Sequence, residues 1–296
     1  MDSDSFASDG SALVRARTMV GEFELTVCTD GTYRLDGGAM FGVVPKTMWQ
    51  KRAFADVDNT ILLGLNTAVI RTGRHTVVIE TGIGNKQTEK MRSIQKNQEL
   101  LPQSLAAAGV RPEEVDVVIN THLHFDHCGW NTTLNPDGTV VPTFPNARYF
   151  VHKGEVAHGH MQHDRDRISY LSANYDPLIE NGQMTLVTDE DIASNPEVVP
   201  GISVELFPGH THQLMGVHIQ SGPEHACYIS DLIPTTAHLD PTWVMGYDLD
   251  PMRSIAERKR FYQRAIPEKW LVLFTHDHMT PMARIVLNDK GKPVVA

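Results

Sequence analysis

The chain has 296 residues, and its 26 lysines and arginines against 36 aspartates and glutamates give a net charge of −10. This acidic balance argues against a nucleic-acid partner, because phosphate backbones are bound by clustered basic residues and no basic cluster is longer than Arg258-Lys259-Arg260. No stretch approaches the roughly 18 apolar residues of a membrane-spanning helix, so no membrane partner is expected.

The N-terminal segment, residues 1 to about 20, is predicted to be disordered, because it has few apolar residues and no hydrophobic period. It is acidic and serine-rich, unlike the basic and then apolar start of a secretory signal. Cys28, Cys128 and Cys227 lie far apart and form no C-x-x-C pair, which is typical of a reducing compartment. We therefore expect a cytoplasmic protein in which residues 21–296 form a single domain.

Two β-hairpins are predicted next. Residues 22–27 alternate polar and apolar side chains, Asp30-Gly31 supplies a tight turn, and residues 32–35 continue the pattern. A second hairpin joins residues 66–71 to residues 76–79 through a turn at Thr72-Gly73-Arg74. Both hairpins are expected in one sheet.

Residues 99–108 predict a short amphipathic helix, with Leu101, Leu105 and Ala108 on one face and Gly109 at the position of a helix C-cap. Later strands are predicted at residues 115–119, 147–151, 202–207, 226–229 and 270–274, which are rich in β-branched and aromatic residues. Residues 153–182 and 251–266 are interpreted as helical or irregular.

Metal-competent side chains follow four of these predicted strands. Strand 115–119 leads into the pattern H-x-H-x-D-H at residues 122–127, and the other three strands lead into His210, Asp231 and His276. Because a strand end fixes the backbone of the loop that follows it, such side chains can converge at one edge of a sheet. Imidazole and carboxylate groups suit zinc, manganese or iron. The predicted metal ligands are His122, His124, Asp126, His127, His210, Asp231 and His276.

Seven ligands are more than one ion uses, so two divalent ions are expected. His122, His124 and His210 would hold the first ion, and Asp126, His127 and His276 the second, with Asp231 bridging them. Zinc is the expected metal, with manganese, iron and cobalt as alternatives. Asp126 is also the predicted catalytic residue, because it would orient a hydroxide held between the ions and shuttle its proton.

These residues resemble the signature of the metallo-β-lactamase-fold superfamily of metallohydrolases, H-x-H-x-D-H followed by a later His, Asp and His. The resemblance spans residues 20 to 280 approximately. It implies an α/β fold, an αββα sandwich with a dinuclear metal site at one edge of the sheets, and the seven ligands named above. Residues 40–46 and 80–86 are similar to the lactonase and esterase-like bacterial branch. Glu80 stands where the superfamily often has aspartate. The tyrosine that acyl-homoserine lactonases carry shortly after the bridging aspartate is missing, since Pro234 lies three residues past Asp231.

The predicted function is hydrolysis of a small-molecule lactone or carboxylic ester. The alternatives are hydrolysis of an organophosphate triester, a non-catalytic sensor or binder that keeps the metals for structure, and a mononuclear iron dioxygenase. Specificity is assigned to the segments at about 40–58, 84–98, 153–182 and 234–250. The oligomeric state stays open, with a homodimer as one option.

Other candidate residues receive structural interpretations. The histidines at 158, 160 and 163 have ligand spacing but are expected on a solvated helix or loop. Cys128 is expected to be a small buried thiol. His238 is assigned a structural hydrogen bond, with contact to substrate as the alternative. Trp243, Met245 and Tyr247 are expected either in the core or along a pocket wall.

Overall fold

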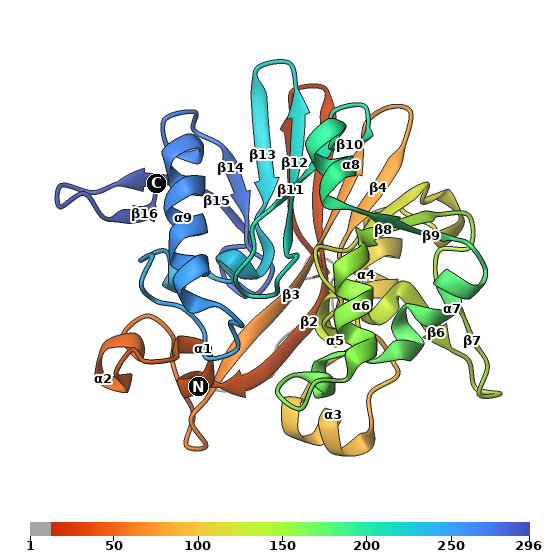
Figure 1. The fold of residues 1–296 in the computed structure, drawn as a ribbon, viewed down its shortest axis with the longest axis horizontal. Helices are drawn as coiled ribbons and strands as arrows, with labels where there is room; N and C mark the ends of the chain where they lie inside the picture. The colour runs from red at the N-terminus through yellow and green to blue at the C-terminus, as the bar shows by residue number, and fades with distance from the viewer. Residues whose placement is uncertain (1–12) are drawn as a thin grey trace.

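Two seven-stranded β-sheets pack between helices in the computed structural model, which describes residues 13–296 (Figure 1). The first sheet contains, in spatial order, β1 Val14–Val20, β2 Phe23–Asp36, β3 Thr60–Arg71, β4 Thr76–Ile79, β5 Val117–Ile119, β8 Arg148–His152 and β9 Met184–Val187. The second sheet contains, also in spatial order, β10 Glu197–Val199, β11 Ile202–Leu206, β12 Met215–Ser221, β13 Glu224–Tyr228, β14 Leu271–Leu273, β15 Met282–Leu287 and β16 Pro293–Val295. A separate pair is formed by β6 Thr132–Leu134 and β7 Val140–Pro142.

Helices cover the outer faces of both sheets. In Figure 1, α9 lies beside the second sheet on the left, and α4 and α6 lie beside the first sheet on the right. The α-helices are α1 Gly37–Phe41, α2 Lys46–Trp49, α3 Glu89–Gln95, α4 Leu101–Ala107, α5 Phe125–Cys128, α6 Lys153–Met161, α7 Asp176–Glu180, α8 Asp189–Ser194 and α9 Pro251–Ala265. The layer order of helix, sheet, sheet and helix confirms the αββα sandwich expected from the sequence.

The core consists of three apolar layers and a fourth apolar cluster around Phe41. Strand β5 shows how they form: Val117 and Ile119 point into the layer between the sheets, while Val118 points toward the helices that cover the first sheet. Successive side chains of a strand point to opposite faces, so a strand that is buried on both faces must be apolar at every position. The third layer lies between the second sheet and α9 and includes Phe207 and Phe261.

The later elements predicted from the sequence are confirmed. Strands β3 and β4 pair antiparallel as the second hairpin, with Ala68 opposite Ile79. Helix α4 falls inside the predicted helix, and Gly109 after it has φ +71°, a conformation that glycine adopts without steric cost. The predicted strands correspond to β5, β8, β11, β13 and β14.

The first predicted hairpin is wrong, because β2 is one continuous strand of 14 residues. Its register against β3 shifts between Thr29 and Thr32, and Gly31 has φ +94°. The Asp30-Gly31 pair therefore forms a β-bulge instead of a turn. The Asp30 carboxylate is fully buried and accepts hydrogen bonds from the Leu101 amide and the Trp130 indole, so the bulge ties β2 to α4.

The prediction of disorder up to residue 20 is wrong for residues 14–20, which form β1 and pair antiparallel with β2. Most β1 side chains are only partly buried. Backbone pairing therefore holds the strand, and an apolar period in the sequence does not reveal it. Residues 1–12 lie outside the described residues.

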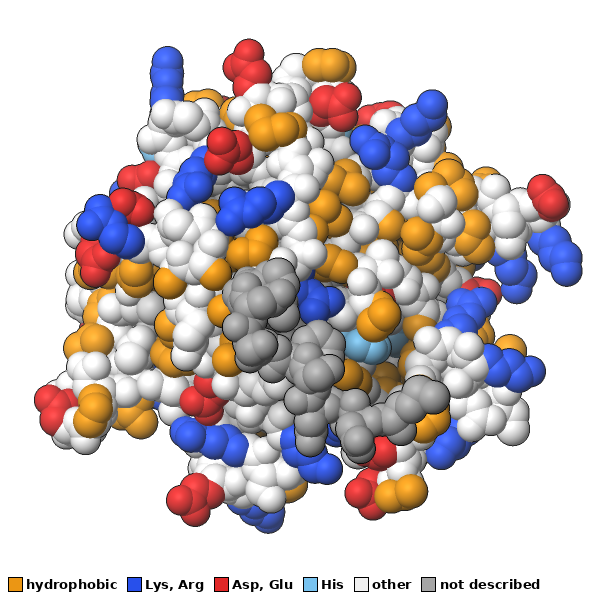
Figure 2. Space-filling view, turned by 180° about the vertical axis from the view of Figure 1, so that it is seen from behind, with side chains coloured by type: hydrophobic (Ala, Val, Ile, Leu, Met, Phe, Trp, Pro, Cys, Tyr) orange, Lys and Arg blue, Asp and Glu red, His pale blue; other side chains and the backbone are white. Residues whose placement is uncertain are grey.

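The helices and the surface are relevant to the expectations from composition. Among residues 13–296, no helix combines the length and apolar character that crossing a bilayer requires. On the face turned away from the viewer in Figure 1, lysine and arginine side chains lie intermixed with aspartate and glutamate side chains (Figure 2).

Candidate metal centre

The H-x-H-x-D-H segment begins directly after β5. Its first part is extended, and His124 has φ −63° and ψ 148° immediately before α5. In extended backbone, residues two apart project to the same side, so His122 and His124 can meet at one point. The single turn of α5 then carries Asp126 and His127 to a second point. All of the predicted ligands are buried except His124, which is partly buried.

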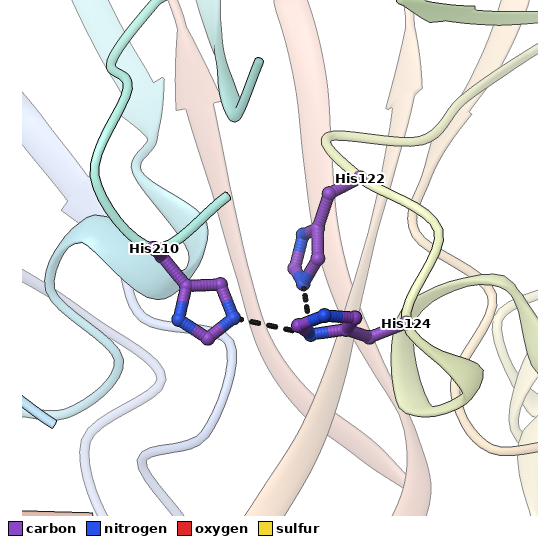
Figure 3. A group of neighbouring side chains, drawn as sticks. All are labelled: His122, His124 and His210. Carbon is purple, nitrogen blue, oxygen red and sulfur yellow. Dashed lines mark hydrogen bonds between the residues drawn. The ribbon is translucent and has the colours of Figure 1, made fainter. Parts of the chain in front are cut away.

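His122, His124 and His210 form the first group of ligand atoms (Figure 3). His124 Nδ1 lies 3.1 Å from His122 Nε2 and 3.1 Å from His210 Nε2. His210 follows β11, so the second sheet contributes to a group that starts on the first. Two nitrogens bound to a tetrahedral zinc ion at ordinary bond lengths lie about 3.3 Å apart, which is close to the observed spacing.

Asp126, His127 and His276 form the second group. The Nε2 atoms of His127 and His276 lie 3.2 Å apart. Asp126 Oδ2 lies 3.9 Å from His127 Nε2 and 3.7 Å from His276 Nε2. His276 follows β14, so this group also joins the ends of both sheets.

Asp231 lies between the two groups, in the 3-10 turn Ser230–Leu232 after β13. Its Oδ2 is 3.3 Å from His210 Nε2 in the first group, and its Oδ1 is 3.1 Å from His276 Nε2 in the second. Oδ1 is buried and makes no hydrogen bond with the described residues. A buried carboxylate oxygen without a donor is costly, and a cation on each side would satisfy it.

The second nitrogen of each ring supports the same conclusion. His276 Nδ1 lies 2.9 Å from the carbonyl oxygen of Gly64, and His210 Nδ1 lies 3.1 Å from Asp248 Oδ1. These oxygens only accept hydrogen bonds, so Nδ1 carries a proton in both rings, and in the neutral form that binds a metal Nε2 has the lone pair. The lone pairs therefore point into the space between the ligands. This donor set fits divalent ions such as zinc.

The pKa values of two residues of the first group agree with metal binding, whereas in the third, His210, the effect of burial is outweighed by the Asp231 and Asp248 carboxylates, which raise the pKa. Burial, followed by repulsion from neighbouring imidazoles, lowers the pKa of both His122 and His124 well below the ordinary value for histidine. Both rings are therefore neutral at neutral pH, which is the form that binds a metal.

A buried polar network supports the ligands from behind. Glu80 Oε1 lies 3.5 Å from His127 Nδ1, and the Thr121 hydroxyl donates to this same carboxylate. Thr121 Oγ1 is also 3.0 Å from His122 Nδ1 and 2.7 Å from Ser230 Oγ. Glu80 and Ser230 have φ values of +61° and +51°, and left-handed backbone of this kind costs energy in residues other than glycine. Glu80, which stands where the superfamily often has aspartate, thus lies behind the ligands.

Sequence reasoning missed two residues next to the ligands. The Tyr33 hydroxyl donates to Asp126 Oδ2 at 2.6 Å, and these residues are 93 positions apart. Asp248, which holds the His210 ring, is 38 positions from it. Neither residue stands in a motif, so the sequence alone offered no signal for either.

A cavity of about 390 Å³ opens onto the ligands and is lined by His124, Asp126, His210, Asp231 and His276. The rest of its wall is mainly apolar. All four segments to which the sequence assigned specificity contribute side chains to this wall, together with β2 of the first sheet; examples are Leu35, Met40, Met91, Ile94, Ile168, Met245 and Tyr247. The volume suits a small organic ligand.

The remaining candidates lie elsewhere. The ring of His238 is buried, stacks on Phe41 at 4.5 Å and contacts the Met40 carbonyl through Nε2, so it does not line the cavity. His158 and His160 pair with Asp166 and Asp176, each at 2.7 Å, and do not converge on one point. Cys128 is buried and its thiol faces backbone carbonyls. Trp243 is a core residue, whereas Met245 and Tyr247 line the cavity.

Comparison with protein families gives one match along most of the chain. The sequence model of the family described as "Metallo-beta-lactamase superfamily" matches residues 61–278. This range contains all seven candidate ligands.

Known proteins give consistent matches. An N-acyl homoserine lactonase from Bacillus cereus is 24% identical over 176 residues, which cover 58% of this chain and 60% of that enzyme. The crystal structure of a probable metal-dependent hydrolase from Staphylococcus aureus superposes with a TM-score of 0.84 at 30% identity, covering 94% of this chain and 99% of the other. A dizinc quorum-quenching lactonase, solved with a product, gives a TM-score of 0.78 at 21% identity, covering 96% and 98% of the two chains.

Proposed function

The chain belongs to the metallo-beta-lactamase superfamily, and from this premise we propose that it is a dinuclear zinc hydrolase that opens a lactone or cleaves a carboxylic ester. The observation that carries the proposal is the arrangement of two ligand groups on either side of Asp231, at the floor of an apolar cavity. The similarity to lactonases supports the lactone part of the proposal.

In this proposal the site residues have three roles: they bind the first ion, bind the second ion, or bridge both. His122, His124 and His210 would hold one ion, Asp126, His127 and His276 the other, and Asp231 both. When bound, two such ions supply an activated water molecule and polarise the carbonyl oxygen of the substrate. The cavity wall holds the apolar part of the substrate and excludes bulk water, which strengthens electrostatic interactions near the ligands.

Asp126 has a second task in this proposal. The hydrogen bond from Tyr33 fixes Oδ2 of Asp126 at 2.6 Å. Asp126 lines the cavity, so its carboxylate can accept a proton from the attacking water and return it to the leaving oxygen. Tyr33 is buried and acts as a positioning residue, because it sets the direction of the carboxylate.

The proposal is tested on protein purified without chelator. Elemental analysis should find about two transition-metal ions per chain, chiefly zinc, on the logic of a dinuclear site. A panel of a γ-lactone, an aryl ester and an aryl phosphotriester should show turnover of the lactone or the ester. Chelation should abolish this turnover and added zinc should restore it.

Each other result selects a different function. Preferred turnover of the phosphotriester would make this chain an organophosphate hydrolase. One iron per chain at full occupancy would favour a dioxygenase. Full metal content with no turnover on any of the three substrates would favour a binder or sensor.

A further inference from the structure

Arg165 differs from the other charged side chains near the mouth of the cavity. Its neighbours are paired: Asp164 with Arg167 at 2.8 Å, and Asp166 with His158 at 2.7 Å. Arg165 lines the cavity, yet no carboxylate among residues 13–296 lies within ion-pair distance of its guanidinium. It is thus a cation at an apolar cavity without a carboxylate partner in the described part of the chain.

Two backbone carbonyls hold the Arg165 side chain in place. Its Nη2 donates to the carbonyl oxygen of Gly246 at 3.0 Å and to that of Asp248 at 3.1 Å. Gly246 lines the cavity together with Met245 and Tyr247. Both bonds use one nitrogen, so Nη1 and Nε have no hydrogen-bond partner among the described residues. The guanidinium is positioned, and its Nη1 and Nε hydrogens are available for single hydrogen bonds.

We propose that Arg165 binds a carboxylate of the substrate, at a distance from the bond that is hydrolysed, so that the preferred substrate is an anionic lactone or ester. The inference rests on the proposed function, since it takes the cavity above the ligands as the substrate site. A hydrogen bond from Nη1 or Nε to a carboxylate oxygen is charge-assisted, and such bonds are roughly twice as strong as those between neutral groups.

The charge of the whole chain makes a local cation necessary for such a substrate. The net charge of −10 repels anions in general. An anionic substrate therefore needs compensation inside the cavity, and among the described lining residues Arg165 is the one lysine or arginine that offers it. A neutral acceptor such as an amide would gain less from the same guanidinium.

The test uses three 4-nitrophenyl esters of equal chain length whose far ends carry a carboxylate, a carboxamide or a methyl group. The zinc-loaded enzyme should show a kcat/KM for the carboxylate ester roughly ten- to a hundredfold above that for the methyl ester. Arg165→Gln should remove this ratio, and Arg165→Lys should retain part of it, because lysine keeps the charge but cannot be held by the two carbonyls in the same planar geometry. Arg167→Gln is the matched control and should leave the ratio unchanged, because Arg167 pairs with Asp164 and does not line the cavity.

Two results would overturn the inference: a ratio near one in the wild type, or a ratio that survives Arg165→Gln. Equal or faster turnover of the carboxamide ester would overturn the anionic class. If none of the esters is hydrolysed, the proposed function fails separately. The role of Arg165 is then tested with the three corresponding ethers, which cannot be hydrolysed. The carboxylate ether should bind more tightly than the methyl ether in wild type, and this ratio of dissociation constants should be lost in Arg165→Gln.

Discussion

Two clusters of imidazole and carboxylate groups within residues 13–296, one buried and one partly buried, are built in opposite ways. In the metal centre, imidazole nitrogens of neighbouring rings face one another at 3.1–3.2 Å. The second cluster, which we call the outer cluster, consists of Glu205, His218, His225 and Cys227 on strands β11 to β13. There, His218 Nε2 contacts Glu205 Oε2 at 2.7 Å and His218 Nδ1 contacts His225 Nε2 at 2.9 Å.

The difference lies in whether the cluster supplies its own cations. Glu205 also pairs with Arg260 and with Arg264, the latter at 2.8 Å, so arginines from α9 compensate its charge. Residues 13–296 contain three groups of potential ligand atoms, namely the two groups of the metal centre and one formed by Glu80, His122 and His127. None of them includes His218 or Cys227. Residue type and burial are therefore not sufficient for a metal site. A metal site also requires that the lone pairs of the ligands point to one place and that no arginine or lysine side chain already neutralises the carboxylates.

The largest expected effect is on Asp231, the residue between the two ligand groups. Asp231→Ala should weaken binding of both ions and lower kcat/KM by at least about 10³, because it leaves two cations without their shared anion. The measurements are metal content after dialysis and turnover on the best substrate of the panel.

Cys227 of the outer cluster provides the control for Asp231. Cys227→Ala should leave the metal content unchanged, although both residues belong to the segment that includes β13 and the turn after it. Loss of metal in Cys227→Ala with retention in Asp231→Ala would mean that the ligands have been assigned in the wrong register.

A smaller effect on catalysis is expected when Asp126 loses its charge but keeps an oxygen atom that can bind the metal. Asp126→Asn keeps the size of the side chain and one oxygen, but it loses the proton acceptor. With metal restored by excess zinc, kcat should fall by about 10² to 10⁴ and KM should change much less, because the cavity wall makes the substrate contacts. Near wild-type kcat in the metal-saturated variant would show that Asp126 is only a ligand.

The contrast between the metal centre and the outer cluster also explains which parts of the site could be predicted from the sequence. The seven candidate ligands were found because each follows a strand that is evident from its apolar residues, and strand ends of a two-sheet sandwich meet at one edge. Asp248 and Tyr33 were missed because their contacts depend on how distant loops and strands pack. The outer cluster was missed for the same reason: Glu205, His218 and His225 meet only through the pairing of β11, β12 and β13.

Local sequence signals failed where tertiary pairing overrode them. Asp30-Gly31 has the composition of a turn, but pairing of β2 with β3 on both sides of it makes a bulge the better solution. Strand β1 has no apolar period, because it is an edge strand that is held by backbone bonds to β2. Both errors concern elements whose partners lie far away or face solvent.

A moderate effect is expected from Asp248, which holds the first group without being a ligand. Asp248→Asn keeps a possible acceptor for His210 Nδ1 but removes the charge, so zinc affinity should fall about 10- to 100-fold. Competition with a chelator measures this affinity. Asp176→Asn is the matched control, because it removes the carboxylate from another His–Asp pair, at 2.7 Å from His160, outside the metal centre. An equal loss of affinity in both variants would indicate general destabilisation rather than ligand positioning.

The smallest effect is expected in the outer cluster, and it appears in the pH dependence of stability. Burial opposes protonation of His218, but the Cys227 thiol and the Glu205 carboxylate raise its pKa from 6.5 to about 9. A pKa that is raised by folding contributes stability that is fully present below about pH 6.5 and is lost as the pH rises toward 9. Glu205→Gln removes the carboxylate, so the variant should have a Tm roughly 3–6 °C below wild type at pH 6, and the gap should narrow toward pH 9.

Wild type and Glu205→Gln have the same metal centre, so the titration of the metal centre cancels in the difference between their Tm values. Metal content and turnover of Glu205→Gln should equal those of wild type, which separates the two clusters. Glu224→Gln is the control, since Glu224 also lies in the second sheet but pairs only loosely with Arg284, at 3.7 Å between exposed side chains, and its Tm should follow wild type at every pH. A Tm gap for Glu205→Gln that stays constant from pH 6 to 9 would show that Glu205 stabilises the fold through α9 alone and does not hold the proton of His218.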